Sequence, residues 1–324
     1  EALKQAEKEA NRLVTADAQI CLARYYLLKE GYEKTKKLID KSISQLKLLV
    51  DGKNEKQIKS RLASVYNLYS ILHYRLGQNQ KSYDYQNEAV RLFREIDDIH
   101  GMTHIMHNLA NSYITDNRLS QAKAMLEEIG NYKDRISLQS LYFYYQNYGL
   151  YYMKSGNHKE AHDSFTEALS IAQSQKMVDS EITVLTLLGK LAVATKMYKQ
   201  AYGVLKEAEE KALEANLEYE LKEVYTQQVE MNKGMGKFNE MQEIEAKLLA
   251  LTQNNEAKIR VEYEKKRKED SLKIAKSKEL MVLREKELLE AHRRRQMMFI
   301  YIPVIGGIVI GAVIFFVLRA RNKR

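Results

Sequence analysis

Proline, cysteine and tryptophan are nearly absent from this 324-residue sequence, which has one Pro, one Cys and no Trp. The single cysteine, Cys21, excludes a disulfide within the chain, so packing must stabilise the fold. Only 14 residues are Gly, whereas 29% are charged. Few helix breakers among many charged residues predict an all-α protein.

Catalytic and nucleotide-binding signatures are missing as well. The sequence contains no G-x-G-x-x-G, no phosphate-binding loop of the Walker type, no H-E-x-x-H and no C-x-x-C. His100, His104 and His107 have a spacing that would bring imidazoles together on a helix, but no carboxylate or thiol partner follows from it. We therefore expect no enzyme, no metal site and no cofactor in these residues.

The net charge of +9 is concentrated towards the end of the chain. Residues 256–296 hold 14 Lys or Arg and 9 Asp or Glu, and residues 319–324 form a tail with four basic residues. The remaining residues, 1–255, carry 34 charges of each sign. This balance argues against a nucleic-acid partner for the larger part of the chain.

One long hydrophobic run, MMFIYIPVIGGIVIGAVIFFVL, covers residues 297–318 and contains no charge. As a helix it would be about 33 Å long, close to the ~30 Å hydrocarbon core of a bilayer. The sequence predicts a transmembrane helix, in contact with membrane lipid, with a buried helix of a soluble core as the alternative. Gly307 and Gly311 form a G-x-x-x-G pair that would let two such helices meet in a homodimer. Basic residues flank both ends, so charge does not orient the span.

A pattern of small and bulky residues recurs in six copies, which start at residues 16, 63, 103, 142, 182 and 222. In the best copy, counted from Tyr142 as position 1, position 8 is Gly149, position 20 is Ala161 and position 24 is Phe165. Small residues at positions 8 and 20 predict two antiparallel helices in close contact, joined by a turn near position 15. Bulky residues at positions 4, 7, 11 and 24 would fill the space between helices.

The last copy departs from this pattern, since positions 8 and 20 are Val229 and Met241. We expect its two helices to pack loosely, as in a terminal repeat.

The pattern resembles the tetratricopeptide repeat over about residues 16–255, although the usual Trp and Pro are absent and the period is nearer 40 than 34. The resemblance implies a right-handed superhelix of about six helix pairs within residues 1–255, which binds a protein or peptide in its concave groove. A non-repeating helical bundle is the alternative. By the resemblance, positions 2, 5 and 9 of the first helices face that groove, where amides and a lysine could bind the backbone of an extended ligand. These positions hold Asn67, His104, His107, Asn111, Gln146 and Lys190.

Residues 256–296 contain neither Gly nor Pro and predict one long charged helix. Ile274, Met281 and Leu288 are spaced by seven, which indicates a coiled coil. No clean alternation of apolar positions extends across the segment, so a solvated connector helix is the other interpretation. Both remain open.

The order of these segments resembles the sensory half of membrane-anchored tetratricopeptide regulators and sensor histidine kinases of Bacteroidetes-type bacteria. That resemblance implies a single-pass protein of the bacterial inner membrane with extracytoplasmic repeats. A signal would pass through the connector and the span to a cytoplasmic kinase or DNA-binding regulator outside this chain.

A tail-anchored cytosolic adaptor that recruits client proteins is the second hypothesis, and an enzyme is the third. The chain starts with Glu1 rather than Met, so we expect that a preceding segment has been removed.

Overall fold

The computed structural model of this protein describes residues 2–50 and 54–253, together with the single residues 279, 284 and 286. The described residues contain helices and turns but no strand, so the predicted all-α class is confirmed. The labelled helices are α1 (Ala2–Leu28), α2 (Tyr32–Lys47), α3 (Glu55–Arg75), α4 (Asn79–Glu95), α5 (Ile99–Thr115), α6 (Leu119–Gly130), η1 (Lys133–Arg135), α7 (Leu138–Lys154), α8 (His158–Ser174), α9 (Val178–Ala194), α10 (Tyr198–Glu214) and α11 (Glu218–Gly234). Residues 238–253 are also helical.

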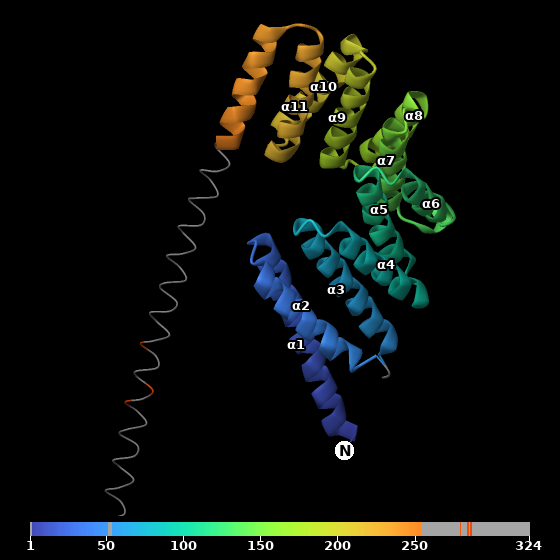
Figure 1. The fold of residues 1–324 in the computed structure, drawn as a ribbon, viewed down its shortest axis with the longest axis vertical. Coiled ribbons are helices and arrows are strands. Elements are labelled where there is room, and N and C mark those ends of the chain that lie inside the picture. Colours follow the sequence, from blue (N-terminus) through green and yellow to red (C-terminus); the bar gives the residue numbers. More distant parts are fainter. Residues whose placement is uncertain (1, 51–53, 254–278, 280–283, 285, 287–324) are drawn as a thin grey trace, which may run out of the picture. The chain divides into compact units, whose positions relative to one another are not determined.

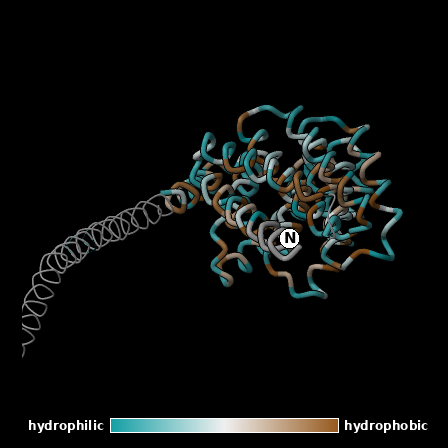
Figure 2. Tube along the Cα trace, turned by 90° about the horizontal axis from the view of Figure 1, so that it is seen from below, coloured by the Kyte–Doolittle hydropathy of each residue, from teal (hydrophilic) through white to brown (hydrophobic). Residues whose placement is uncertain are grey.

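Consecutive helices form antiparallel pairs within one compact unit, Glu1–Leu249. The pairs are α1 with α2, α3 with α4, α5 with α6, α7 with α8 and α9 with α10, and each pair packs on the next along the chain. In Figure 1 the helix of residues 238–253 (orange) follows α11 as the second member of a further pair. Hydrophobic and hydrophilic residues alternate along the helices in Figure 2, as expected when each helix buries one side. The predicted fold of helix-pair repeats is confirmed.

The turn within each pair falls on position 15 of the repeat, as the pattern predicts. All six residues there have a positive φ, which lets the chain leave the first helix and reverse direction. They are Glu30 (φ 56°), Gly77 (69°), Asn117 (60°), Gly156 (80°), Lys196 (59°) and Gly236 (72°). After Gly156 the amide of Asn157 donates to the Tyr152 carbonyl at 2.9 Å, which closes the helix end. The turn predicted near position 15 is therefore present in all six copies.

The glycines at position 8 allow the close approach of the two helices. A Cβ on Gly149 would lie 2.4 Å from the ring of Phe165, and a Cβ on Gly189 would lie 2.4 Å from Leu205. Both partners occupy position 24, one helical turn beyond the alanine of position 20 in the same helix. The glycine thus contacts the large side chain of position 24 rather than position 20, where Ala161 is fully buried.

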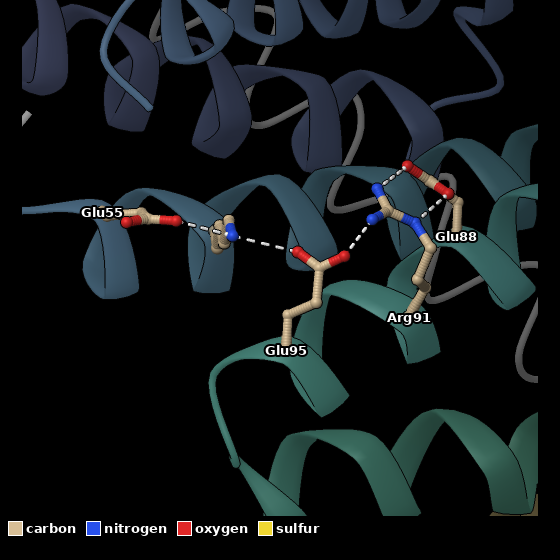
Figure 3. A network of polar contacts seen from close by, with 5 residues as sticks. Glu55, Glu88, Arg91 and Glu95 are labelled. Carbon is tan, nitrogen blue, oxygen red and sulfur yellow. Dashed lines mark hydrogen bonds and ion pairs between the residues drawn. The ribbon is translucent and has the colours of Figure 1, made fainter. Parts of the chain in front are cut away.

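A network of ion pairs connects α3 with α4 on the surface (Figure 3). The Lys59 ammonium lies 2.7 Å from Glu55 and 3.0 Å from Glu95, and Arg91 pairs with Glu95 and Glu88. The hydrogen bond from Lys59, with the nearby Arg91, lowers the pKa of the Glu95 carboxyl. Surface pairs of this kind contribute little singly, so the network supplements the packing between these helices.

The prediction of a single-pass membrane protein is corrected by the structure. No helix within residues 2–50 and 54–253 is both long enough and apolar enough for a bilayer crossing. The longest two, α1 with 27 residues and α3 with 21, carry charged residues along their length. The predicted span 297–318, the connector 256–296 and the basic tail 319–324 lie outside the continuously described residues, and so does the glycine pair Gly307 and Gly311. The membrane localisation is withdrawn, and the dimer contact stays an untested prediction.

Candidate functional site

Two of the predicted ligand-binding residues meet in one cavity. Asn67 of α3 and Asn111 of α5 line a space of about 310 Å³ between α3, α4 and α5. α3 and α5 are the first helices of neighbouring pairs, and α4 contributes the buried Ser82 and Gln86. We call this space the amide cavity. Its remaining lining residues are Ser70, Ile71, Tyr74, Asn108 and Ser112.

The amide cavity is polar without being charged, since none of its lining residues is Asp, Glu, Lys or Arg. Its serines are partly occupied by local bonds. The Ser70 hydroxyl donates to the Asn67 carbonyl at 2.7 Å, and the Ser112 hydroxyl donates to the Asn108 carbonyl at 2.9 Å. The site therefore offers amide groups and exposed Tyr74 and Ile71 side chains rather than an electrostatic clamp.

Two residues that line this cavity carry a buried side-chain oxygen without a partner within the described part of the chain. They are Oδ1 of Asn67 and Oε1 of Gln86, and the Gln86 residue is only 5% exposed. An unsatisfied buried polar atom costs about 1–3 kcal/mol. This cost is avoided where a ligand or a water molecule supplies the missing hydrogen bond. Water does not reach either oxygen, so a donor in the amide cavity would bind them only after the side chains turn towards it.

Sequence reasoning missed Gln86 because only the first helices were searched for ligand-binding positions. Gln86 is position 24 of its repeat, where the neighbouring copies have Ile39 and Leu126. A polar residue at position 24 was the available signal, because four of the other five copies have a large apolar residue there. The last copy, with the exposed Glu245 at this position, carries the same interruption.

Lys190 lies in a second, smaller cavity between α9 and α11, again the first helices of neighbouring pairs. This space of about 190 Å³ is lined by Lys190 together with Tyr219, Glu220 and Glu223. Lys190 is exposed, so its ammonium is available to a partner. The cavity has both signs of charge, unlike the amide cavity.

The other three predicted residues are placed less favourably for binding. His104 is exposed on α5 and Gln146 is half-buried on α7. His107 is buried, with 4% exposure, and its Nε2 lies 2.9 Å from the Ser140 hydroxyl of α7. Burial, reinforced by the neighbouring His104, lowers the pKa of His107 to about 4. His107 thus connects two repeats as a neutral ring instead of facing a ligand.

Comparison with known proteins supports the repeat assignment. Residues 144–175, which lie in α7 and α8, match the model of the tetratricopeptide repeat. Residues 36–116 match the model described as anaphase-promoting complex subunit 5. No curated protein matches the chain.

Several solved structures share the fold at low identity. The apo form of RapI is 15% identical with a TM-score of 0.61, over 72% of this chain and 83% of that one. BtubC (BKLC) from P. vanneervenii is 16% identical with a TM-score of 0.53, over 66% and 91% of the two chains. A Rap protein complexed with competence and sporulation factor is 12% identical with a TM-score of 0.52, over 75% and 76%. These likenesses support the fold, and none of them supports the predicted membrane-anchored layout. The described residues thus form tetratricopeptide-like repeats.

Proposed function

We propose that this chain is a peptide-binding module that holds an extended segment of a partner along the first helices of its repeats. The observation that carries the proposal is the pair of unpartnered acceptors, Asn67 Oδ1 and Gln86 Oε1, in the amide cavity. The similar Rap protein was solved with competence and sporulation factor bound, which is consistent with a peptide ligand on this fold.

The chemistry of the cavity favours peptide backbone over a charged group. A main chain supplies one N–H donor at every residue other than proline. No lining residue would neutralise a buried charge, so a charged group would lose its hydration without compensation. Asn108 and Asn111 add amides that can both donate and accept, which suits the alternating groups of an extended backbone.

The cavity at Lys190 extends the proposed binding surface towards the last repeats. Lys190 can bind a carboxylate of the ligand, and Glu220 or Glu223 can bind a basic side chain. We propose that the cavity at Lys190 binds side chains of the ligand, while the amide cavity binds its backbone.

We also propose that ligand binding to this chain transmits a signal. Each repeat contacts mainly its sequence neighbours, so a ligand that bridges several first helices would favour one arrangement of the repeats over others. That change of arrangement would be the signal passed to an output outside the described residues.

Affinity selection from a random hexapeptide library with blocked ends tests the binding function. The full chain serves as bait, and dissociation constants of the selected peptides are then measured for the wild type and for Asn67→Leu/Gln86→Met. These changes keep the side-chain size and remove both acceptors, so the fold remains stable. We expect the affinity to fall at least about tenfold, the value of one to two hydrogen bonds.

Gln121→Leu is the matched control, because Gln121 is exposed on α6, away from both cavities. It should bind the selected peptides as the wild type does. If the double variant also binds with unchanged affinity, or if the wild type selects no peptide, the proposed function is wrong.

A further inference from the structure

The first helix of the array, α1, has an exposed apolar side. Five uncharged residues recur there at intervals of four, three, four and three, so they lie along one side of the helix. They are Val14, Ala18, Cys21, Tyr25 and Leu28, and all five are exposed. Val14 and Leu28, at the two ends, are 66% and 72% exposed. We call this side the α1 stripe, and a continuous apolar surface of this kind marks an interaction site.

The next first helix, α3, uses the equivalent side to contact the preceding helix pair. Arg61 and Arg75 stand at the repeat positions that begin and end the α1 stripe. Arg61 Nε donates to Asp17 Oδ1 of α1 at 2.8 Å. Arg75 Nη1 donates to the Leu27 carbonyl of α1 at 3.0 Å. Both ends of this side therefore bind the preceding first helix.

The middle of the α1 stripe has the same equivalence. Asn147 of α7 stands at the position of Cys21, and its Nδ2 donates to the His107 carbonyl of α5 at 3.0 Å. Position 3, which is Ala18 in α1, is buried in all five later copies, where it is Val65, Ile105, Tyr144, Val184 and Val224. Ala18 is exposed because no helix pair precedes α1 among the described residues. The α1 stripe is thus a packing face without its neighbour.

The opposite end of the array does not offer a matching surface. Positions 2, 5 and 12 of a first helix accept the contacts from the following pair that are described above. In α11 these positions are Glu223, Thr226 and Lys233, and all three are exposed. A polar outer face is typical of a terminal repeat. Head-to-tail stacking of two copies would press the apolar α1 stripe against these polar groups, which disfavours it.

A second copy of α1 matches the stripe in both spacing and charge. Alternate intervals of three and four are the heptad pattern by which the side chains of two helices interlock. Asp17 and Arg24 flank the stripe on one side, seven residues apart. When two α1 helices run antiparallel, Asp17 of each copy lies beside Arg24 of the other. When they run parallel, Arg24 lies beside Lys29 of the other copy, which is repulsive.

The Asp17 carboxylate remains available for this contact although it already pairs with Arg61. Its side chain is 44% exposed. A carboxylate has about four acceptor sites, so it can bind a second guanidinium. Arg24 is exposed and has no ion pair within the described part of the chain. An exposed pair of this kind adds little affinity, so it selects the orientation while the apolar stripe supplies the attraction.

We propose that two copies of this chain associate through their α1 stripes as an antiparallel helix pair. Cys21 of one copy then lies beside Ala18 of the other, and Val14 lies beside Tyr25. The contact is two-fold symmetric, so it closes as a dimer and does not continue into a filament. It goes beyond the proposed peptide binding, because no α1 residue lines the amide cavity or the cavity at Lys190.

Cys21 makes the contact directly testable, since it is exposed and is the one cysteine of the chain. The purified full chain is treated with a short bismaleimide, and the dissociation constant of the dimer is measured by sedimentation equilibrium. We expect a covalent dimer whose yield rises with protein concentration. Ala18→Glu should raise the dissociation constant at least about tenfold, because it places a carboxylate against the apolar stripe of the other copy.

The fold should tolerate Ala18→Glu, because the position is exposed and glutamate is a good helix former. Ala124→Glu, at an exposed alanine of α6, is the matched control and should dimerise as the wild type does. Arg24→Glu tests the orientation. It should weaken an antiparallel dimer by bringing two carboxylates together, whereas a tighter dimer would indicate parallel helices and overturn the arrangement.

Two further outcomes would overturn the proposal. One is a dimer that Ala18→Glu leaves unchanged, as expected if the copies met at Gly307 and Gly311. The other is a chain that stays monomeric, whether Cys21 reacts with maleimide or is shielded by another segment of the chain. Asn67→Leu/Gln86→Met should dimerise normally, so a failure of peptide selection and a failure of dimerisation are distinguishable.

Discussion

The fourth helix pair (α7 and α8) and the last helix pair (α11 with residues 238–253) are copies of the same repeat, yet their packing differs. In the fourth pair, Gly149 receives the Phe165 ring so closely that no Cβ would fit. In the last pair, Val229 and Met241 stand at the small positions, and a cavity of about 610 Å³ lies beside their helices. The comparison shows that only the closely packed pair requires a glycine at position 8.

The fourth repeat also differs from the second and from the last in where glutamine replaces a large core residue. Position 7 is Tyr148 in the fourth repeat and Gln228 in the last, and position 24 is Phe165 in the fourth repeat but Gln86 in the second. Both glutamines are buried with an unpaired carbonyl beside a cavity. Apolar core positions make the scaffold, and the polar exception Gln86 marks the candidate peptide site.

The largest expected effect comes from adding a side chain at position 8. Gly149→Leu should lower the free energy of unfolding by about 3 kcal/mol or more, because the new atoms collide with the Phe165 ring. Val229→Leu at the equivalent position of the last repeat should change it by less than about 1 kcal/mol, since Val229 is half-buried and already has a branched side chain. Urea denaturation measures both. Equal losses in the two variants would contradict the contrast between the repeats.

Acid should weaken the central repeats through His107. The ring titrates near 6.5 when unfolded and at a pKa of about 4 when folded, so the unfolded state binds the proton first. The free energy of unfolding should fall as the pH drops from 6.5 to 4, by up to ~3 kcal/mol. Carboxylates titrate in the same range, so the measurement is the difference between the wild type and His107→Gln at each pH. His158→Gln, on an exposed histidine of α8, should retain the full acid sensitivity.

The smallest effect concerns the turns at position 15. Gly156→Ala and Gly236→Ala each introduce a side chain at a φ of 80° and 72°, with no steric contact, so each should cost about 1–2 kcal/mol locally. A terminal repeat is held by one neighbour, and a central repeat by two. Gly156→Ala should therefore shift the main urea transition, whereas Gly236→Ala should mainly speed hydrogen exchange in residues 218–253. Identical exchange profiles for the two variants would show that the last repeat is as cooperative as the centre.

Much of the scaffold follows from local chemistry and was predictable. The positions of Gly149 and Ala161 predict two helices in close contact, and Gly156 predicts a turn with a positive φ between them. The same pattern of small and turn residues recurs in the other copies, so it predicts the same helix pair there. The first-helix positions also led to Asn67 and Asn111, which the structure brings into one cavity. The membrane assignment rested on the uncharged run of residues 297–318, which lies outside the described residues, and no described helix supports it.

What the residues alone determined is the repeat: its length, its turns and the small positions where helices touch, because these depend on contacts within a short stretch of chain. What only the tertiary structure decided is which polar atoms remain without partners. The sequence shows Gln86 and Gln228 only as polar residues at positions that are usually apolar, and their burial follows from the packing of neighbouring helices. Burial removes water from an acceptor only after segments distant in sequence have packed together, and no local pattern contains that information.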